Sequence, residues 1–236
     1  MGRDERIRVT ERCELRQRLA VITTTNAKER LMTLLRELMS AKDFTAAVKR
    51  LADPVSLRFD LPAAYHLGLV VADAVAADQA MTREWGVDPA LIMDTEVGRW
   101  IENGKESRAN VRFGFSSHQR YELELIEPRQ EADFYTRDLP VDGDIHLHHL
   151  GIWVRDLDVQ TARLTSQGIP LMVRGYSGSG PVSGNFAYFD TRPEFGIITE
   201  LTCTRLLGIQ TRIPSPRLAR YVGRRQIASG KRVLSF

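Results

Sequence analysis

The 236-residue sequence has little cysteine, no long apolar run and no acidic residue after Glu200. Two cysteines, Cys13 and Cys203, are too few for a disulfide framework and are typical of proteins in a reducing cytoplasm. No apolar run approaches the roughly 18 residues of a membrane span, and the charged N-terminus lacks the apolar region of a signal peptide. We therefore expect a cytoplasmic protein without a membrane partner.

The charge of the chain is distributed unevenly. Eight basic residues and no acidic one follow Glu200, whereas the residues up to Glu200 carry a net charge of −5. Such a basic segment can bind phosphates, a nucleic acid or an acidic neighbour. Only Tyr221 interrupts the basic residues before the terminal Phe236, too few aromatic rings for a surface that stacks bases. We expect residues 206–236 to form a basic tail that packs on the domain or on a second copy, compatible with a homodimer, and expect no nucleic-acid partner.

A ten-residue stretch occurs twice in the chain. The copies Ala64–Asp73 and Leu147–Asp156 share the pattern His-Leu-Gly-apolar-x-Val-x-Asp. Each copy runs into a segment with helical propensity, Ala74–Trp85 in the first case and Leu157–Gln167 in the second. A repeat of this kind predicts two similar structural units and determines the architecture of the whole chain.

Both units show the same predicted order of elements, a strand, a helix and three strands. Short runs rich in Leu, Val and Ile predict the strands, and polar residues mark the turns. The predicted strands are Tyr65–Val71, Leu91–Ile101, Val111–Phe115 and Tyr121–Ile126, then Leu147–Val154, Ile169–Val173, Asn185–Phe189 and Gly196–Leu201. We expect an α+β fold in which two βαβββ modules in tandem, about 62–128 and 146–204, form a cup-shaped mixed β-sheet with flanking helices.

The segments outside the modules carry weaker signals. In residues 1–60 we expect an N-terminal helical extension, where apolar residues at helical spacing predict one helix from Leu31 to Leu38. Asp43 can cap a second short helix that stops before Pro54. Inside the second module, the glycine-rich segment 175–184 has no helix after it and therefore does not predict a phosphate-binding loop. It reads as a connector or as the rim of a pocket, and no nucleotide cofactor is expected.

The first and last strands of each module would bring two histidines and two glutamates together on the concave side: His66, Glu124, His149 and Glu200. The spacing is similar in both modules, 58 residues from His66 to Glu124 and 51 from His149 to Glu200. Since residues i and i+2 of a strand share a face, the leucines that flank Glu124 point into the core and its carboxylate points away. An unpaired buried carboxylate costs several kcal/mol and needs a cation. This donor set suits one divalent ion of zinc, nickel, cobalt, manganese or iron(II).

These motifs resemble those of the vicinal oxygen chelate superfamily, which contains glyoxalase I, methylmalonyl-CoA epimerase, extradiol ring-cleaving dioxygenases and the fosfomycin and bleomycin resistance proteins. The resemblance covers roughly residues 62–205, which we take as the domain 61–205. It rests on four segments: His66–Val71, Glu122–Pro128, His148–Val154 and Phe195–Leu201. By resemblance, His66, Glu124, His149 and Glu200 match metal-ligand positions.

The resemblance implies a glyoxalase-like lyase or isomerase that acts on a small oxygenated or thioester substrate. Substrate oxygens would chelate the ion, which would stabilise an enediolate or enolate, and Glu200 or Glu124 would act as the base. Two alternatives stay open on the same fold: an iron(II)-dependent ring-cleaving dioxygenase, and a metal-free binding or resistance protein.

Other side chains are candidates for binding the substrate. Epimerases of the family carry a glutamate that acts as a base on the third strand of the first module. Arg112 occupies the matching place here, which argues against two-base epimerisation. Arg112 could instead bind a substrate carboxylate or phosphate, or pair with Glu122 or Glu124. Tyr121 and Tyr188 are further candidates for binding the substrate, and His118 for orienting it.

Overall fold

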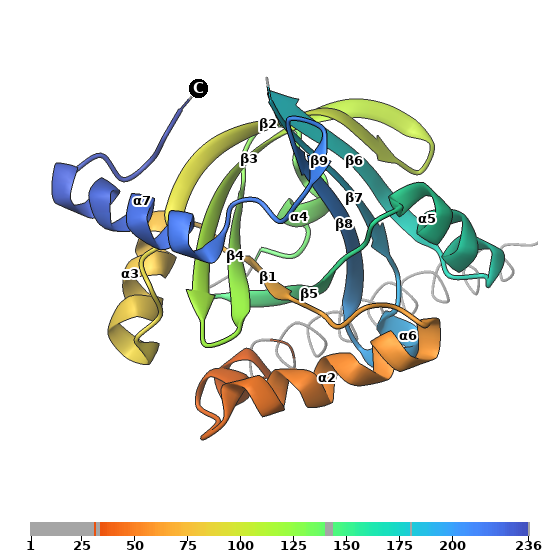
Figure 1. The fold of residues 1–236 in the computed structure, drawn as a ribbon, viewed down its shortest axis with the longest axis horizontal. Helices are drawn as coiled ribbons and strands as arrows, with labels where there is room; N and C mark the ends of the chain where they lie inside the picture. The colour runs from red at the N-terminus through yellow and green to blue at the C-terminus, as the bar shows by residue number, and fades with distance from the viewer. Residues whose placement is uncertain (1–30, 32–33, 140–143, 180, 236) are drawn as a thin grey trace, which may run out of the picture.

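The computed structural model describes residues 31, 34–139, 144–179 and 181–235 (Figure 1). Residues 34–39 are helical, as predicted, and lead to α2 (Phe44–Phe59). Most of the predicted N-terminal extension, residues 1–30, lies outside the described part. Within the described part, no helix combines the length and hydrophobicity needed to cross a membrane.

The two predicted βαβββ modules are confirmed. Module 1 consists of β1 (His66–Val70), α3 (Ala74–Trp85), β2 (Leu91–Glu102), β3 (Lys105–His118) and β4 (Tyr121–Pro128). Module 2 consists of β5 (His146–Trp153), α5 (Leu157–Ser166), β6 (Leu171–Ser179), β7 (Val182–Phe189) and β8 (Ile198–Leu206), with the short helix α6 (Arg192–Phe195) before β8. The segment between the modules contains the short helix α4 (Asp133–Thr136).

The strands form one sheet that closes on itself. Their order is β5-β1-β4-β3-β2-β6-β7-β8-β9, and β5 also pairs with β8. β1 and β5 are antiparallel to each other, and each is parallel to the last strand of its own module, β4 or β8. On the opposite side the modules meet where Arg99–Glu102 of β2 pairs with Val173–Tyr176 of β6. The sheet thus forms a cup with one wall from each module (Figure 1).

The aspartate that ends each copy of the repeat begins the helix that follows. Asp73 accepts hydrogen bonds from the backbone N–H groups of Val75 and Ala76, and Asp156 accepts one from Val159. Each aspartate is an N-cap that satisfies backbone donors with no partner inside the helix. The repeated motif therefore specifies a strand, a turn and a helix start.

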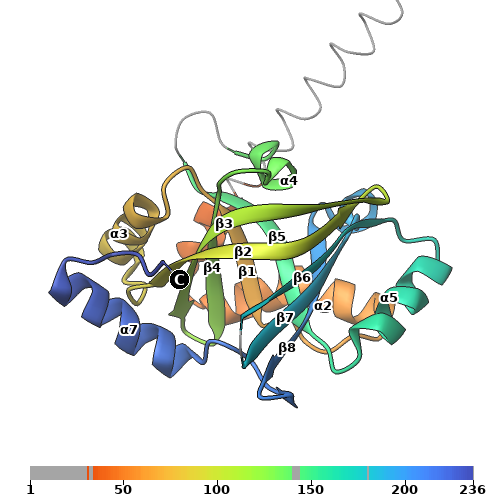
Figure 2. The same cartoon turned by 90° about the horizontal axis from the view of Figure 1, so that it is seen from above.

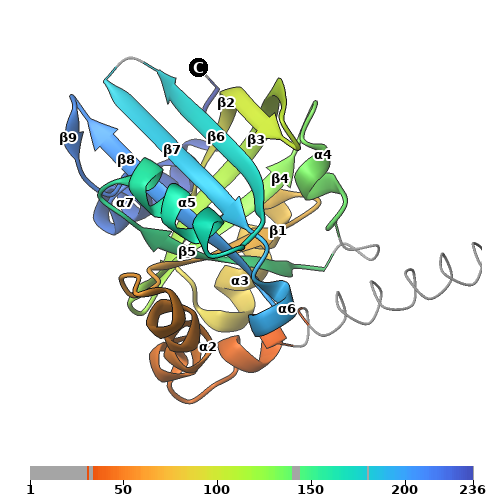
Figure 3. The ribbon, with the colours of Figure 1, turned by 90° about the vertical axis from the view of Figure 1, so that its right-hand side faces the viewer.

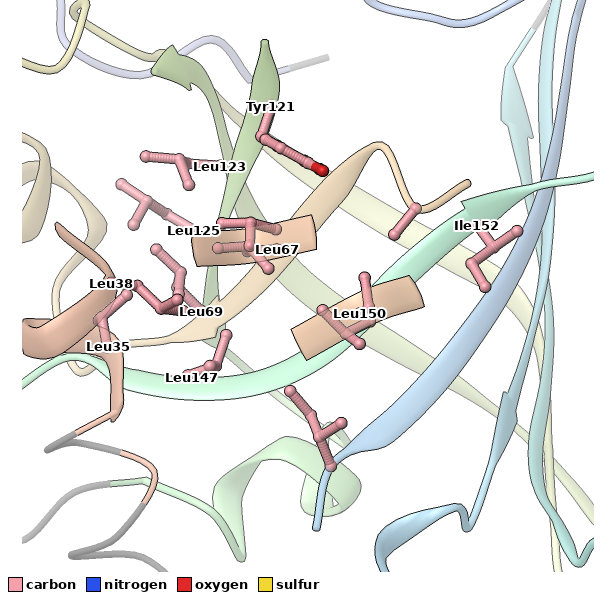
Figure 4. Close-up of a cluster of buried hydrophobic side chains, with 14 of the residues drawn as sticks. Leu35, Leu38, Leu67, Leu69, Tyr121, Leu123, Leu125, Leu147, Leu150 and Ile152 are labelled. Carbon is pink, nitrogen blue, oxygen red and sulfur yellow. The ribbon is translucent and has the colours of Figure 1, made fainter. Parts of the chain in front are cut away.

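Alternation along the strands separates two hydrophobic cores. The outer core lies between the cup and its helices. Figure 4 shows leucines from β1, β4 and β5 meeting those of the helical residues 34–39. Its labelled members include Leu35, Leu38, Leu67, Leu69, Leu123, Leu125, Leu147 and Leu150. The inner core lies among the strands and α4 and is rich in aromatic residues: Trp100, Phe113, Phe134, Tyr135, Phe186 and Tyr188. Figure 3 shows α5 across the outer face of the module 2 wall.

Two predictions about local structure are wrong. The helix expected to stop before Pro54 continues through it as α2, because the following turn buries Val55 and Phe59 in the outer core, which offsets the loss of one backbone donor. The glycine-rich segment 175–184, expected as a connector, belongs largely to the hairpin of β6 and β7. Gly175 permits this pairing, since a Cβ atom there would lie 2.0 Å from the ring of Phe186.

The basic tail packs on module 1. After the short strand β9 (Ile209–Gln210), α7 (Pro216–Ser229) lies against β2 and β3. Gly223 allows close approach, because a Cβ atom there would lie 2.4 Å from the carbonyl oxygen of Pro89. Gln226 forms two hydrogen bonds with the backbone of Ile92, and Arg232 pairs with the buried Asp78. The boundaries of the extension and tail at residues 60 and 206 remain a prediction.

Candidate metal centre

Two histidines from different modules face each other where β1 and β5 cross. In the antiparallel pairing, His66 lies opposite Gly151, and Gly68 lies opposite His149. A Cβ atom on Gly68 would lie 1.9 Å from Cε1 of His149, and one on Gly151 would lie 1.8 Å from Cε1 of His66. The glycine of each His-Leu-Gly motif therefore provides the space for the imidazole of the other module.

The last strand of each module adds a carboxylate. Glu124 on β4 and Glu200 on β8 lie beside β1 and β5, respectively, in the parallel pairings. Nε2 of His66 lies 3.0 Å from Nε2 of His149, 3.0 Å from Oε2 of Glu200 and 3.7 Å from Oε2 of Glu124. Nε2 of His149 lies 3.6 Å from Glu124 and 3.5 Å from Glu200. Each of the four residues offers one ligand atom, and these atoms all lie within 4.8 Å of one another. We call His66, Glu124, His149 and Glu200 the cluster.

These distances fit a shared divalent ion. Two ligands at about 2.0–2.2 Å from one ion are about 3–3.5 Å apart at tetrahedral or octahedral angles, close to the separations above. Oε2 of Glu124 is buried and has no hydrogen-bond partner among the described residues. A buried carboxylate oxygen without a partner is costly, and a cation between the four donors would satisfy it.

The electrostatics of the cluster also favour a cation. Burial lowers the pKa of His149, but the charge of Glu200 and the proximity of both carboxylates raise it overall to about 9. Burial would raise the pKa of Glu200, but the neighbouring His149 and His66 hold it well below its usual range. The two carboxylates therefore attract positive charge, which a proton or a metal ion can supply.

His148 lies next to the cluster, which simple alternation along β5 did not predict. The pairing of β1 with β5 skips from His149 to Leu147, so His148 is the extra residue of a β-bulge. Its Nδ1 atom lies 3.0 Å from Nδ1 of His149, and its Nε2 atom lies 3.5 Å from Oδ2 of Asp138. Burial lowers the pKa of His148 to about 4, so its ring is neutral at pH 7.

The neutral ring of His148 can orient its neighbour. If Nε2 of His149 binds a metal ion, its Nδ1 carries the proton and donates to Nδ1 of His148, whose own Nε2–H faces Asp138. Partners of this kind fix the tautomer and ring orientation of histidine ligands. In the sequence, the signal for this role was the pair of adjacent histidines, His148 and His149.

Tyr188 lies on the fully buried side of the cluster. Its ring centroid is 5.1 Å from that of His149, and its hydroxyl lies 2.8 Å from the hydroxyl of Tyr135 on α4. Burial raises the pKa of Tyr188 well above the usual value, and the charge of Glu200 raises it further. Tyr188 is thus a neutral phenol beside the cluster, whereas Tyr135, from the segment between the modules, was not expected here.

The opposite side of the cluster is more exposed. The side chain of Glu124 is 15% exposed, compared with 7% for Glu200 and none for His149. Glu122 shares the face of Glu124 on β4, and burial raises its pKa to about 7 against the lowering effect of His66 and Arg212. We call Glu122, Glu124, Tyr65 and Arg212 the exposed side of the cluster.

Three other candidates lie away from the cluster, and their roles toward a substrate remain predictions. Arg112 lies on the outer face of β3, where its guanidinium is 2.7 Å from the carboxylate of Asp94. Its cross-strand partner on β4 is Glu127, which alternates with the inward-facing residues of that strand. Tyr121 points into the outer core, where its ring packs against Phe44. His118 also packs against Phe44, and burial lowers its pKa.

Comparison with known proteins gives one family and several similar folds. Residues 65–189 match a family model described as the glyoxalase/bleomycin resistance protein/dioxygenase superfamily. Similar structures include methylmalonyl-CoA epimerase from Mycobacterium tuberculosis, at 21% identity and a TM-score of 0.40, covering 59% of this chain and 85% of that chain. A Streptomyces coelicolor methylmalonyl-CoA epimerase variant, in complex with 2-nitronate-propionyl-CoA, has 16% identity, a TM-score of 0.43 and coverage of 60% and 96%. No curated protein matches the chain.

Proposed function

The chain belongs to the glyoxalase/bleomycin resistance protein/dioxygenase superfamily, and from this premise we propose that it is a divalent-metal-dependent enzyme that removes a proton beside a carbonyl group. It would be a lyase or isomerase of the glyoxalase type, acting on a small oxygenated or thioester substrate. The observation that carries the proposal is the convergence of His66, Glu124, His149 and Glu200 from both modules.

Two imidazole nitrogens and two carboxylate oxygens would hold the ion. This mixed donor set without sulfur suits zinc, nickel, cobalt, manganese or iron(II). A bound divalent ion supplies a Lewis acid for substrate oxygens. The neutral His148 would keep His149 in the tautomer that presents Nε2 to the site.

The two carboxylates are placed for different tasks. Glu200 lies close to both imidazoles and is nearly buried, so it is suited to hold their orientation. Glu124 lies farther from both imidazoles, its side chain is more exposed, and its Oε2 atom lacks a hydrogen-bond partner among the described residues. We therefore assign Glu124 as the group that accepts the substrate proton.

The donor set favours this function over the alternatives. Iron(II) oxygenases of the facial-triad type use two histidines and one carboxylate and leave the other positions open, whereas four donors converge here. A metal-free binding protein would leave the buried oxygen of Glu124 without a partner, at a cost of about 1–3 kcal/mol or more for a charged group.

Deuterium exchange tests the proposed reaction. The zinc-, nickel-, cobalt- and manganese-loaded proteins are incubated without dioxygen in D₂O with a panel of α-hydroxy ketones, hemithioacetals and acyl thioesters. NMR should show metal-dependent exchange of the proton beside the carbonyl group for at least one panel member. Glu124→Gln should abolish exchange while retaining metal, and Glu200→Gln should lose metal. Turnover that requires dioxygen, or exchange undiminished in Glu124→Gln, would contradict the proposal.

A further inference from the structure

The C-terminal segment contributes a cation to the exposed side of the cluster. Residues 211–215 connect β9, which pairs with the last strand of module 2, to α7, which packs on module 1. Figures 1 and 2 show this connection passing between the two walls at the end of the cup opposite α4. It lies outside the residues that match the family, and Arg212 is its basic residue.

Arg212 lies one aromatic ring away from the cluster. Its guanidinium carbon is 4.8 Å from the ring centroid of Tyr65, and that ring makes an edge contact with His66 at a centroid distance of 4.5 Å. Tyr65 is held in place because its backbone N–H donates to the carbonyl oxygen of Gly151 and its carbonyl accepts from the N–H of Glu122. The cation therefore sits on a fixed aromatic platform beside the proposed ligands.

The guanidinium of Arg212 has its hydrogen-bond donors available. In the part of the chain that the structure describes, Arg212 forms no ion pair and donates no hydrogen bond, whereas three other arginines of the tail pair with aspartates on module 1. A cation–π contact uses the charge of the guanidinium but none of its N–H groups. Arginine presents these donors in a fork that matches a carboxylate or a phosphate.

We propose that Arg212 is an anion-binding position on the exposed side of the cluster. It would take the carboxylate or phosphate of a substrate whose other end reaches His66, Glu124, His149 and Glu200. This inference rests on the proposed function and adds the substrate class, an oxygenated compound with a separate anionic group. The tail would thus add a substrate-binding residue from outside the segment that matches the family.

Chelating probes test the inference. Alkyl hydroxamates bind zinc through two oxygens, so we would titrate the zinc-loaded protein by calorimetry with three series. One series carries a distal carboxylate, one a distal phosphonate and one a neutral methyl end, each with two to four methylene groups between the ends. The variant is Arg212→Gln, and the matched control is Arg225→Gln, an exposed arginine on α7.

We expect at least one anionic series to bind the natural protein about two- to fivefold more tightly than its neutral counterpart, the range of a partly exposed charge pair. Arg212→Gln should remove this preference and Arg225→Gln should keep it, and the tighter anionic series identifies carboxylate or phosphate. Equal binding of charged and neutral probes, or a preference that survives Arg212→Gln, would overturn the inference alone. Failure of the protein to bind zinc would overturn the proposed function and the inference with it.

Discussion

Gly68 and Gly151 make the cluster possible at the scale of single residues. Each glycine lies opposite the histidine of the other module, and either Cβ atom would fall less than 2 Å from an imidazole carbon. The repeat of His-Leu-Gly is therefore a reciprocal packing requirement as well as a repeat of ligands. The imidazole of His149 is fully buried, so it has no free space into which it could move.

Substitution of Gly68 by alanine should affect both stability and metal binding. We expect Gly68→Ala to lower the free energy of unfolding by about 1–3 kcal/mol through overpacking, and to weaken zinc binding because the ring of His149 is displaced. Urea unfolding of the metal-free protein and a zinc titration measure the two effects. Gly98→Ala is the control, since nothing lies within 4 Å of a Cβ atom there; equal behaviour of the two variants would refute the packing argument.

His148 should affect metal binding through one acceptor atom, its Nδ1. The oxygen of asparagine can occupy the place of Nδ1 and accept from His149, whereas leucine cannot. We expect His148→Leu to weaken zinc binding by about 10–100-fold and His148→Asn to recover most of that loss. In ¹⁵N NMR, the zinc-loaded protein with His148→Asn should retain the Nδ1–H tautomer of His149. Equal zinc affinities of the two variants would assign His148 a packing role only.

Several of these residues could be predicted from the sequence and others could not. The four members of the cluster could be predicted because a repeat places His and Glu at matched positions, and because strand parity decides which way each side chain points. Parity also shows why Arg112 and Tyr121 point away from the inside of the cup: each lies one position from an inward-facing residue of its strand. His148 was missed because a bulge breaks the alternation on which parity depends.

At the scale of elements, α7 covers an edge of the cup. β2 pairs with β6 only from Arg99 onward, so the earlier part of β2 has a free edge toward the tail. Gln226 occupies this edge: its side-chain oxygen accepts from the N–H of Ile92, and its amide donates to the Ile92 carbonyl. Leu234 continues the pairing beside Met93. One glutamine and a short bridge thus replace a neighbouring strand.

Removal of this side-chain amide should destabilise the fold. Gln226→Leu would leave the buried N–H of Ile92 without a partner, at about 1–3 kcal/mol, whereas the Ile92 carbonyl would keep the hydrogen bond from the N–H of Leu234. We expect a loss of about 1–3 kcal/mol in the free energy of unfolding, measured from the urea midpoint. Arg225→Leu, on the exposed face of the same helix, should change it by no more than about 0.5 kcal/mol. A similar small change for Gln226→Leu would show that α7 does not depend on this contact.

The lengths of elements were less predictable than their order. The hairpin of β2 and β3 is longer than expected because it turns at Asn103 and Gly104, both with positive φ, and Asn-Gly is a strong signal for such a turn. The hairpin of β6 and β7 was missed because glycine is unfavourable in strands, and only the neighbouring ring of Phe186 explains Gly175. The first error overlooked a local turn signal, whereas the second depends on a contact across the hairpin.

At the scale of the whole molecule, the fold brings strands from both modules to one point. The pair β1–β5 and the pair β2–β6 join the modules on opposite sides, and the cluster lies at the first junction. α4 fills one side of the interior with Phe134 and Tyr135, so the cluster has one buried side and one more exposed side. The closure of the sheet could be predicted from the repeat, whereas the packing of α4 inside the cup could be seen only in the structure.

The central claim is that both modules together hold one divalent ion. The most direct measurement is X-ray absorption at the zinc edge on the zinc-loaded protein, combined with elemental analysis. We predict one zinc per chain, bound by nitrogen and oxygen at about 2.0–2.2 Å with two imidazoles, and loss of this signal in both His66→Ala and His149→Ala. Sub-stoichiometric zinc, a sulfur ligand, or a site that survives either substitution would contradict it.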